Sequence, residues 1–177
     1  MGWMTNSCGF FKKVLLVLVA ACALAGCRLS VSLTGGNVDP RAKTVYIQTF
    51  RNNSSLGNPT LSHEFTSALK DRIQSQTPLT IIDMQNGDYR LEGEITGYSI
   101  NPVAIQGDET AAMNRLTITV NVRFTNTFDE NQNFEQSFSR YVDYPSTQNF
   151  TSIESSLVQT INEALTEDIF NKAFVNW

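Results

Sequence analysis

Cys27 is the residue of this chain with the most clearly defined chemistry, because of the residues that precede it. The stretch Leu24-Ala25-Gly26-Cys27 places small side chains immediately before the thiol. A basic pair, Lys12-Lys13, and a short apolar run over residues 14–21 come earlier. This order is typical of an exported precursor that is cut after a small residue. The pattern therefore predicts an exported chain in which Cys27 follows the cleavage point.

The four residues that end at Cys27 resemble the lipobox of bacterial lipoproteins. The resemblance implies a diacylglyceryl thioether on Cys27 and a further acyl chain on its amine. The alternative, a transmembrane anchor, needs roughly 20 apolar residues, which the run over residues 14–25 does not supply. We therefore expect residues 1–26 to be a cleaved lipoprotein signal peptide and residues 27–42 to be the acylated N-terminus and a tether. Residues 43–177 then form a single domain.

The other residues that could do chemistry lack the partners that a catalytic site needs. His63, the only histidine, lies beside Ser62 and Glu64, and successive positions of a helix point about 100° apart. Glu92 and Glu94 share a strand face, which is more typical of a solvated surface than of an acid–base pair. No phosphate loop or calcium loop is present. We expect no enzyme activity, no catalytic or metal-binding residues, and no cofactor apart from the lipid on Cys27.

Charge and cysteine content exclude two further classes of function, nucleic-acid binding and chemistry at a thiol. The chain has 13 basic and 17 acidic residues, and loss of Lys12 and Lys13 leaves 11 basic residues, a net side-chain charge of −6. Such a chain lacks the phosphate-neutralising surface of a nucleic-acid binder. Cys8 and Cys22 leave with the signal peptide, so with Cys27 acylated no thiol remains for a disulfide, a zinc site or a nucleophile.

Apolar periodicity predicts an α+β chain with the element order β-α-β-β-β-β-α. Asn58-Pro59 indicates the start of the first helix, and Thr151 to Glu154 has capping-box spacing at the start of the last. The predicted strands lie near residues 45–50, 79–82, 89–97, 116–125 and 134–144, and the helices cover residues 59–76 and the chain from 151 onward. Residues 51–57 and 101–114 are predicted loops. The β-α-β start implies a parallel pair, and the later strands a meander. The expected fold is a two-layer sandwich with two helices on one face of a mixed four- to five-stranded sheet.

The predicted strand 116–125 has an unusual polar face. Its outward residues carry hydroxyl and amide groups with few charges, which fits either a solvated face or a surface that docks into the polar interior of another protein. Arg115 with Arg123, or Lys70 with Arg72, could contact an anionic ligand. The candidate partner- or ligand-binding residues are therefore Arg115, Thr117, Thr119, Asn121 and Arg123.

Several stretches resemble the lipopolysaccharide-assembly lipoproteins of the LptE family, in the form found in Bacteroidetes. They are VYIQTFRN, LSHEFTSALKDRIQSQTPLTIID, DYRLEGEITGYSINPVA, NRLTITVNVRFTN and FEQSFSRYVDYP, and the resemblance covers residues 27 to 170. It implies an outer-membrane lipoprotein with two helices on a four-stranded sheet. Such proteins plug the lumen of the LptD β-barrel, assist its assembly and bind lipopolysaccharide, without catalysis. Arg28 after Cys27 is not the aspartate of inner-membrane retention, which favours the outer membrane, with the body in the periplasm or the barrel lumen.

An alternative reading is a periplasmic lipoprotein module of a Tol- or curli-secretion-like system, whose members share a similar strand–helix arrangement. Such a module would bind a peptide by adding it as a strand to the sheet edge.

Overall fold

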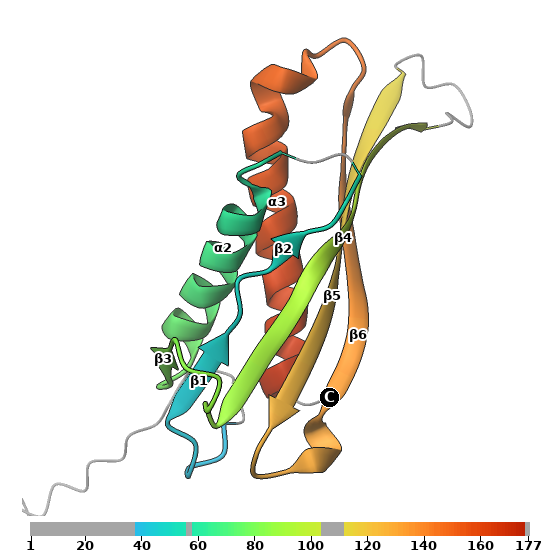
Figure 1. Ribbon diagram of the computed structural model, residues 1–177. Helices are drawn as coiled ribbons and strands as arrows, with labels where there is room; N and C mark the ends of the chain where they lie inside the picture. The colour runs from blue at the N-terminus through green and yellow to red at the C-terminus, as the bar shows by residue number, and fades with distance from the viewer. Residues whose placement is uncertain (1–37, 56–57, 104–111, 176–177) are drawn as a thin grey trace, which may run out of the picture. The chain divides into compact units, whose positions relative to one another are not determined.

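The computed structural model describes residues 38–55, 58–103 and 112–175 (Figure 1). The predicted signal peptide 1–26, Cys27 and the tether up to residue 37 lie outside the described residues. The strands are β1 (Thr44–Ile47), β2 (Arg51–Asn52), β3 (Thr80–Ile82), β4 (Tyr89–Val103), β5 (Met113–Asn126) and β6 (Phe134–Pro145). The helices are α2 (Leu61–Gln76), α3 (Phe150–Phe170), the 3-10 turn η1 (Glu130–Gln132) and the π-helical turn η2 (Asn171–Val175). Within the described part of the chain, no helix has both the length and the apolar character needed to cross a bilayer.

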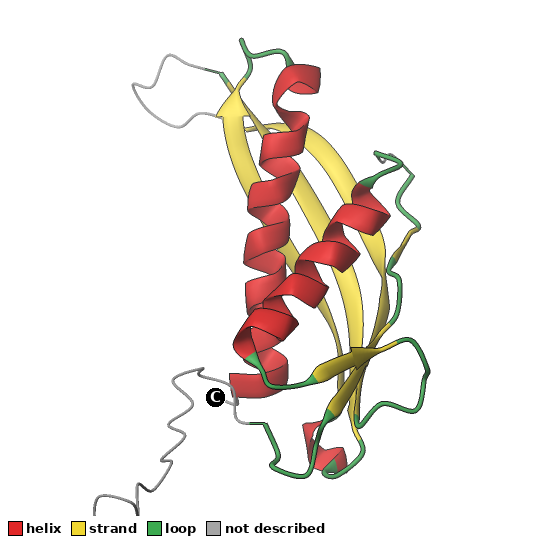
Figure 2. Ribbon diagram, turned by 90° about the vertical axis from the view of Figure 1, so that its left-hand side faces the viewer, coloured by secondary structure: helices red, strands yellow, loops and turns green. Residues whose placement is uncertain are grey.

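The predicted fold class is confirmed: α2 and α3 form one layer and the strands form the other (Figure 2). The sheet order is β3-β1-β4-β5-β6, with β4, β5 and β6 antiparallel. β1 is parallel to β3, as the β-α-β start predicts, and it is also parallel to β4 on its other side. The prediction of a loop over residues 51–57 is wrong for its first two residues. Arg51 and Asn52 form β2, which pairs with Glu94 and Ile95 of β4.

β4 and β5 extend further than the sequence pattern indicates, since residues 101–103 and 113–114 continue the ladder instead of forming a loop. The reason is a bulge between Ile95 and Gly97, where the register shifts by one residue. Beyond it the inward face changes phase, so that Tyr98 is buried. The Tyr98 hydroxyl donates to Glu154 Oε1 over 2.8 Å, and burial together with this bond raises the pKa of Tyr98.

Both helices begin at caps that differ from the predicted ones. Asn58 Oδ1 accepts from Thr60 N over 3.0 Å, and α2 begins two residues later than predicted, at Leu61. Asn149 is the N-cap of α3, and its side chain accepts from Thr151 N over 3.0 Å. The predicted capping box at Thr151 is therefore wrong. A capping asparagine is as favourable as serine or threonine, and here it precedes the predicted cap by two residues.

The core lies between the two layers. α2 buries Leu61, Phe65, Leu69 and Ile73, which are spaced four residues apart along one face of the helix. α3 buries Ile161, Leu165 and Ile169, as predicted, and at its C-terminal end Phe170 and η2 complete an aromatic cluster against the sheet. The cluster consists of Tyr89, Phe124, Phe134, Phe138, Phe170 and Phe174.

The first described residues, 38–42, pack on this body although the sequence places them in the tether. Ala42 is buried, and Val38 packs against the core. Asp39 N donates to Tyr89 Oη over 3.1 Å, while the Arg41 guanidinium lies 4.7 Å from the centre of the Phe128 ring. The chain therefore joins the body at the start of β4.

Asp88 ties the starts of β1 and β4 together. Its Oδ2 accepts from Lys43 N at 2.9 Å, Thr44 N at 2.9 Å and Thr44 Oγ1 at 2.8 Å, and these bonds hold the pKa of Asp88 below its ordinary value. This contribution to stability is present above the unfolded-state pKa of about 3.9 and is lost as the pH falls through the lower folded-state pKa. Asp88→Asn should lower the free energy of unfolding by about 1–2 kcal/mol at pH 7, a value kept small by solvent access. Urea titrations at pH 7 and below pH 4 check this, since the gap between the proteins should shrink in acid. A gap that is unchanged at low pH would contradict it.

Candidate functional site

The face of the sheet opposite the helices holds the predicted binding residues; we call it the open face. Successive strand residues point to opposite sides. Because Leu116, Ile118, Val120 and Val122 are fully buried beneath the helices, the residues that alternate with them point the other way. The structure thereby brings all five candidates into one row along β5: Arg115, Thr117, Thr119, Asn121 and Arg123. Their role in binding stays a prediction.

Arg115 and Arg123 are paired with carboxylates on neighbouring strands. Arg115 binds Asp143 of β6 through two bonds, Nε to Oδ1 at 2.7 Å and Nη2 to Oδ2 at 2.8 Å. These bonds hold the pKa of Asp143 below its ordinary value. The same guanidinium lies 3.7 Å from the centre of the Tyr141 ring. Arg123 binds Glu92 of β4, with 3.1 Å between Nη2 and Oε2.

The uncharged candidates also pair across the strands. Thr119 Oγ1 lies 3.0 Å from Ser139 Oγ, and Asn121 Nδ2 donates to Glu135 Oε1 over 3.2 Å. Thr117 lies in register between Ser99 and Tyr141. The row along β5 is therefore polar and paired with its neighbours, while Glu94 and Glu135 beside it have, among the described residues, amide partners only.

A hollow of about 260 Å³ indents the open face near the end of β4 that pairs with β1 and β2. It is lined by Gln48, Glu92, Gly93, Glu94, Asn121, Arg123 and Glu135. Three carboxylates surround one guanidinium there, so the hollow attracts cations more than phosphates.

Neither predicted basic pair forms an anion clamp. Arg115 and Arg123 are eight residues apart on one strand, which separates them by roughly 27 Å. Lys70 and Arg72 are two positions apart on α2 and so project about 200° apart around the helix. The partners Asp143 and Glu92 were missed at the sequence level, because cross-strand neighbours depend on register. The sequence signal that could have revealed these ion pairs is a pair of opposite charges at matching positions of two predicted strands.

Gly93 lets β4 and β5 approach each other beside this hollow. A Cβ at this position would contact the carbonyl oxygen of Asn121 and lie 2.8 Å from Phe50 Cε1. Phe50 is fully buried and cannot swing away. Gly93→Ala should therefore cost about 1–3 kcal/mol of unfolding free energy in a urea titration. Gly97→Ala is the control, because its Cβ would come no closer than 3.1 Å to its neighbours, where it meets the Thr119 side chain. Equal losses in the two variants would contradict the argument.

The other residues considered for chemistry are His63, Glu92 and Glu94. His63 is exposed on α2, while the neighbouring Ser62 hydroxyl donates to the Phe50 carbonyl over 2.6 Å. Glu94 accepts from Asn53, and Glu92 is held by Arg123. Among the residues that the structure describes, no three His, Cys, Asp or Glu side chains cluster so as to hold a metal ion.

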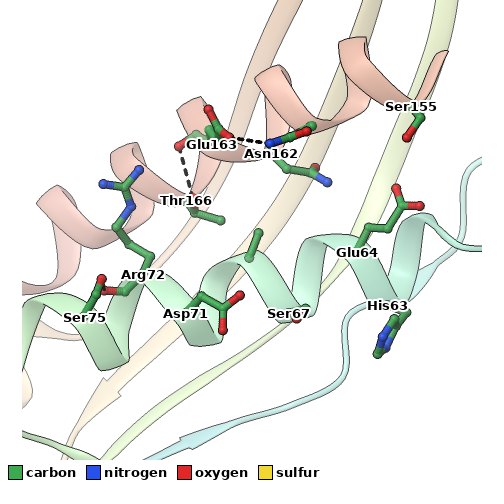
Figure 3. Close-up of a pocket in the computed structure, with 12 residues that line it drawn as sticks. His63, Glu64, Ser67, Asp71, Arg72, Ser75, Ser155, Asn162, Glu163 and Thr166 are labelled. Atoms are coloured by element: carbon green, nitrogen blue, oxygen red, sulfur yellow. Dashed lines mark hydrogen bonds between the residues drawn. The ribbon is translucent and has the colours of Figure 1, made fainter. Parts of the chain in front are cut away.

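A second and larger hollow lies between α2 and α3 (Figure 3). The sequence analysis did not identify it.

Comparisons with known proteins support the fold and identify the family. A minor lipoprotein from Acinetobacter baumannii is similar over 74% of this chain and 91% of its own, at 14% identity and a TM-score of 0.50. A hypothetical protein from Chlamydia trachomatis is similar over 76% of this chain and 98% of its own, at 11% identity and a TM-score of 0.50. No curated protein sequence matches the chain. The family model described as "LptE: Lipopolysaccharide-assembly" matches residues 42–173, most of the chain and nearly all of the described body. This protein therefore belongs to the LptE family of lipopolysaccharide-assembly proteins.

Proposed function

We propose that this protein is an outer-membrane lipoprotein, acylated at Cys27, that works in lipopolysaccharide assembly as the partner of an LptD-type β-barrel. In this proposal residues 1–26 are removed, residues 27–37 reach the membrane and the folded body enters the barrel lumen. The body plugs the barrel, assists its assembly and contacts lipopolysaccharide. It performs no catalysis.

The open face is the observation that carries this proposal. A charge that is buried in an interface without a partner costs several kcal/mol. Here Arg115 and Arg123 already have carboxylate partners, and two hydroxyls and one amide occupy the row between them. Such a face keeps hydrogen-bonding capacity for a polar barrel wall, and both arginines of the row keep their counter-charges when it docks.

The length of the tether supports a body held close to the membrane. Ten residues separate Cys27 from Val38, the first described residue. At about 3.3 Å per residue they bridge at most roughly 33 Å. Several acyl chains anchor a protein stably without a spanning helix, so the anchor keeps the body within reach of a barrel in the same membrane.

The ion pairs of the open face limit how lipopolysaccharide could bind there. Phosphates that approach the open face would have to compete with Asp143 for Arg115 and with Glu92 for Arg123. We therefore expect lipopolysaccharide binding to be weak for the isolated protein and to strengthen in a complex that rearranges these pairs.

A detergent pull-down of the tagged lipoprotein from its native outer membrane, followed by mass spectrometry, tests the proposal. We expect a large β-barrel at about one-to-one stoichiometry. A Cys27→Ala variant controls for the anchor, because it cannot be acylated and should not recover the barrel. Recovery of the lipoprotein alone would contradict the proposal.

The alternative function, a periplasmic module of a Tol- or curli-secretion-like system, is favoured by the edge strand β6. β6 has 12 residues, and the sheet ends with it. An exposed edge of this length is a template for strand addition by a peptide. Recovery of soluble periplasmic proteins in place of a barrel would support this alternative.

A further inference from the structure

The groove between α2 and α3 is not filled by the side chains that face each other across it. It has a volume of about 700 Å³ and lies on the helical layer, away from the open face (Figure 3). Facing helices normally interlock large apolar side chains. Here α2 contributes Ser67, Ala68 and Ser75, and α3 contributes Ser155 and Thr166, all of which are small. A groove with room for a ligand is the result.

The charges that line the groove are mostly negative. Glu64 and Asp71 of α2 and Glu163 of α3 oppose a single guanidinium, that of Arg72. The ion pairs within the described residues include none of these four. Glu64 accepts from the Thr60 hydroxyl and Glu163 from the Gln159 amide, which are neutral donors. His63, which also lines the groove, points away from α3 in Figure 3.

Asn162 supplies a second, independent feature of the groove. Its side chain lines the groove, and the residue is only 3% exposed. Its Oδ1 accepts no hydrogen bond from any residue that the structure describes. An acceptor that is buried without a donor is costly to the fold. A turn of the amide about its Cβ–Cγ bond would bring this atom to the surface of the groove, where it could accept from a donor that enters between the helices.

From these features we propose that the groove binds an organic cation through N–H donors of an ammonium or guanidinium group. The carboxylates of Asp71 and Glu163 would balance its charge, and Asn162 Oδ1, once its amide turns toward the groove, would accept one of its hydrogen bonds. The negative lining disfavours phosphates. The same chemistry is available from a free polyamine or from a lysine or arginine side chain of a partner protein. The proposal depends neither on the barrel nor on lipopolysaccharide.

Isothermal titration calorimetry on the mature lipoprotein in detergent tests this site. The probes are spermidine, for a free polyamine, and Nα-acetyl-arginine amide, for a protein side chain. We expect one saturable site for at least one probe. Asn162→Leu, which keeps the volume but removes the acceptor, should weaken binding about tenfold, as should Glu163→Gln. Glu130→Gln is the matched control, because it removes an exposed carboxylate from η1, outside the groove.

Each outcome of the titration is decisive. Binding of spermidine alone supports a free polyamine, and binding of the arginine amide alone supports a side chain of a partner. Failure of both probes to bind, or equal binding by Asn162→Leu, Glu163→Gln and Glu130→Gln, would overturn the proposal. Thermal unfolding checks that the variants are folded. The midpoint temperature of Asn162→Leu should be no lower than that of the parent protein. If it does not fold, Glu163→Gln at its exposed position still decides the result.

Discussion

Thr119→Glu combined with Arg123→Glu should release the protein from its barrel partner while leaving the body folded. Thr119 lies in the centre of the open face beside Ser139, so a carboxylate there would be desolvated on docking. Arg123→Glu would leave Glu92 without its guanidinium and place a further negative charge near Glu135. Two unpaired charges at about 2–5 kcal/mol each amount to at least about a thousandfold loss of affinity. Co-purification with the barrel measures this loss.

The matched control for this double variant lies on the helical layer. Gln74→Glu with Lys70→Glu changes the charge by the same amount, on the part of α2 that does not line the groove. It should leave co-purification unchanged. Circular dichroism of both double variants should show folded protein, since exposed charges contribute little to stability. Equal recovery of the barrel with both variants would show that the open face does not dock.

Phe124→Ala should cause the largest loss of stability among single substitutions in the sheet. Phe124 is 1% exposed and lies at the centre of the aromatic cluster. Its ring centre lies 5.6 Å from that of Tyr89, 5.4 Å from that of Phe134 and 5.6 Å from that of Phe174. Removal of the ring should cost about 3–5 kcal/mol, out of the roughly 5–15 kcal/mol that such domains have.

Urea unfolding followed by circular dichroism measures this loss. Tyr141→Ala serves as the control, because Tyr141 is 55% exposed on the open face, and it should cost less than about 1 kcal/mol. A loss below about 1 kcal/mol for Phe124→Ala would mean that η2 and β6 do not pack on β5 as described.

The elements with strong periodicity were predictable from the sequence. Alternation from Leu116 to Phe124 gives both the strand β5 and its buried face, and the spacing of Leu61, Phe65, Leu69 and Ile73 gives α2. These patterns follow from the period of side-chain directions, which is local to each element.

Features that depend on contacts between distant segments could not be predicted in this way. β1 is parallel to both β3 and β4, and the two-residue strand β2 exists only because β4 offers it a partner. The bulge after Ile95 changes which residues of β4 face inward, and no local pattern marks its position.

In the candidate site, too, local features could be predicted and contacts between distant segments could not. Alternation alone places Thr117 and Thr119 on the open face, but the pairing of Arg115 with Asp143 requires the register of β5 and β6. The groove depends on how far α2 and α3 lie apart, which is a property of packing. Its small residues Ser67, Ala68 and Ser155 were the signal that the sequence offered.

Site-specific photo-crosslinking in cells tests the docking of the open face most directly. A photoreactive residue would be placed at Thr117 or Ser137 on the open face, and at Gln74 or Thr160 on the exposed sides of the helices. We predict crosslinks to a large β-barrel from the open-face positions and none from the helical positions. Crosslinks from the helices alone, or no barrel from any position, would contradict the proposed docking.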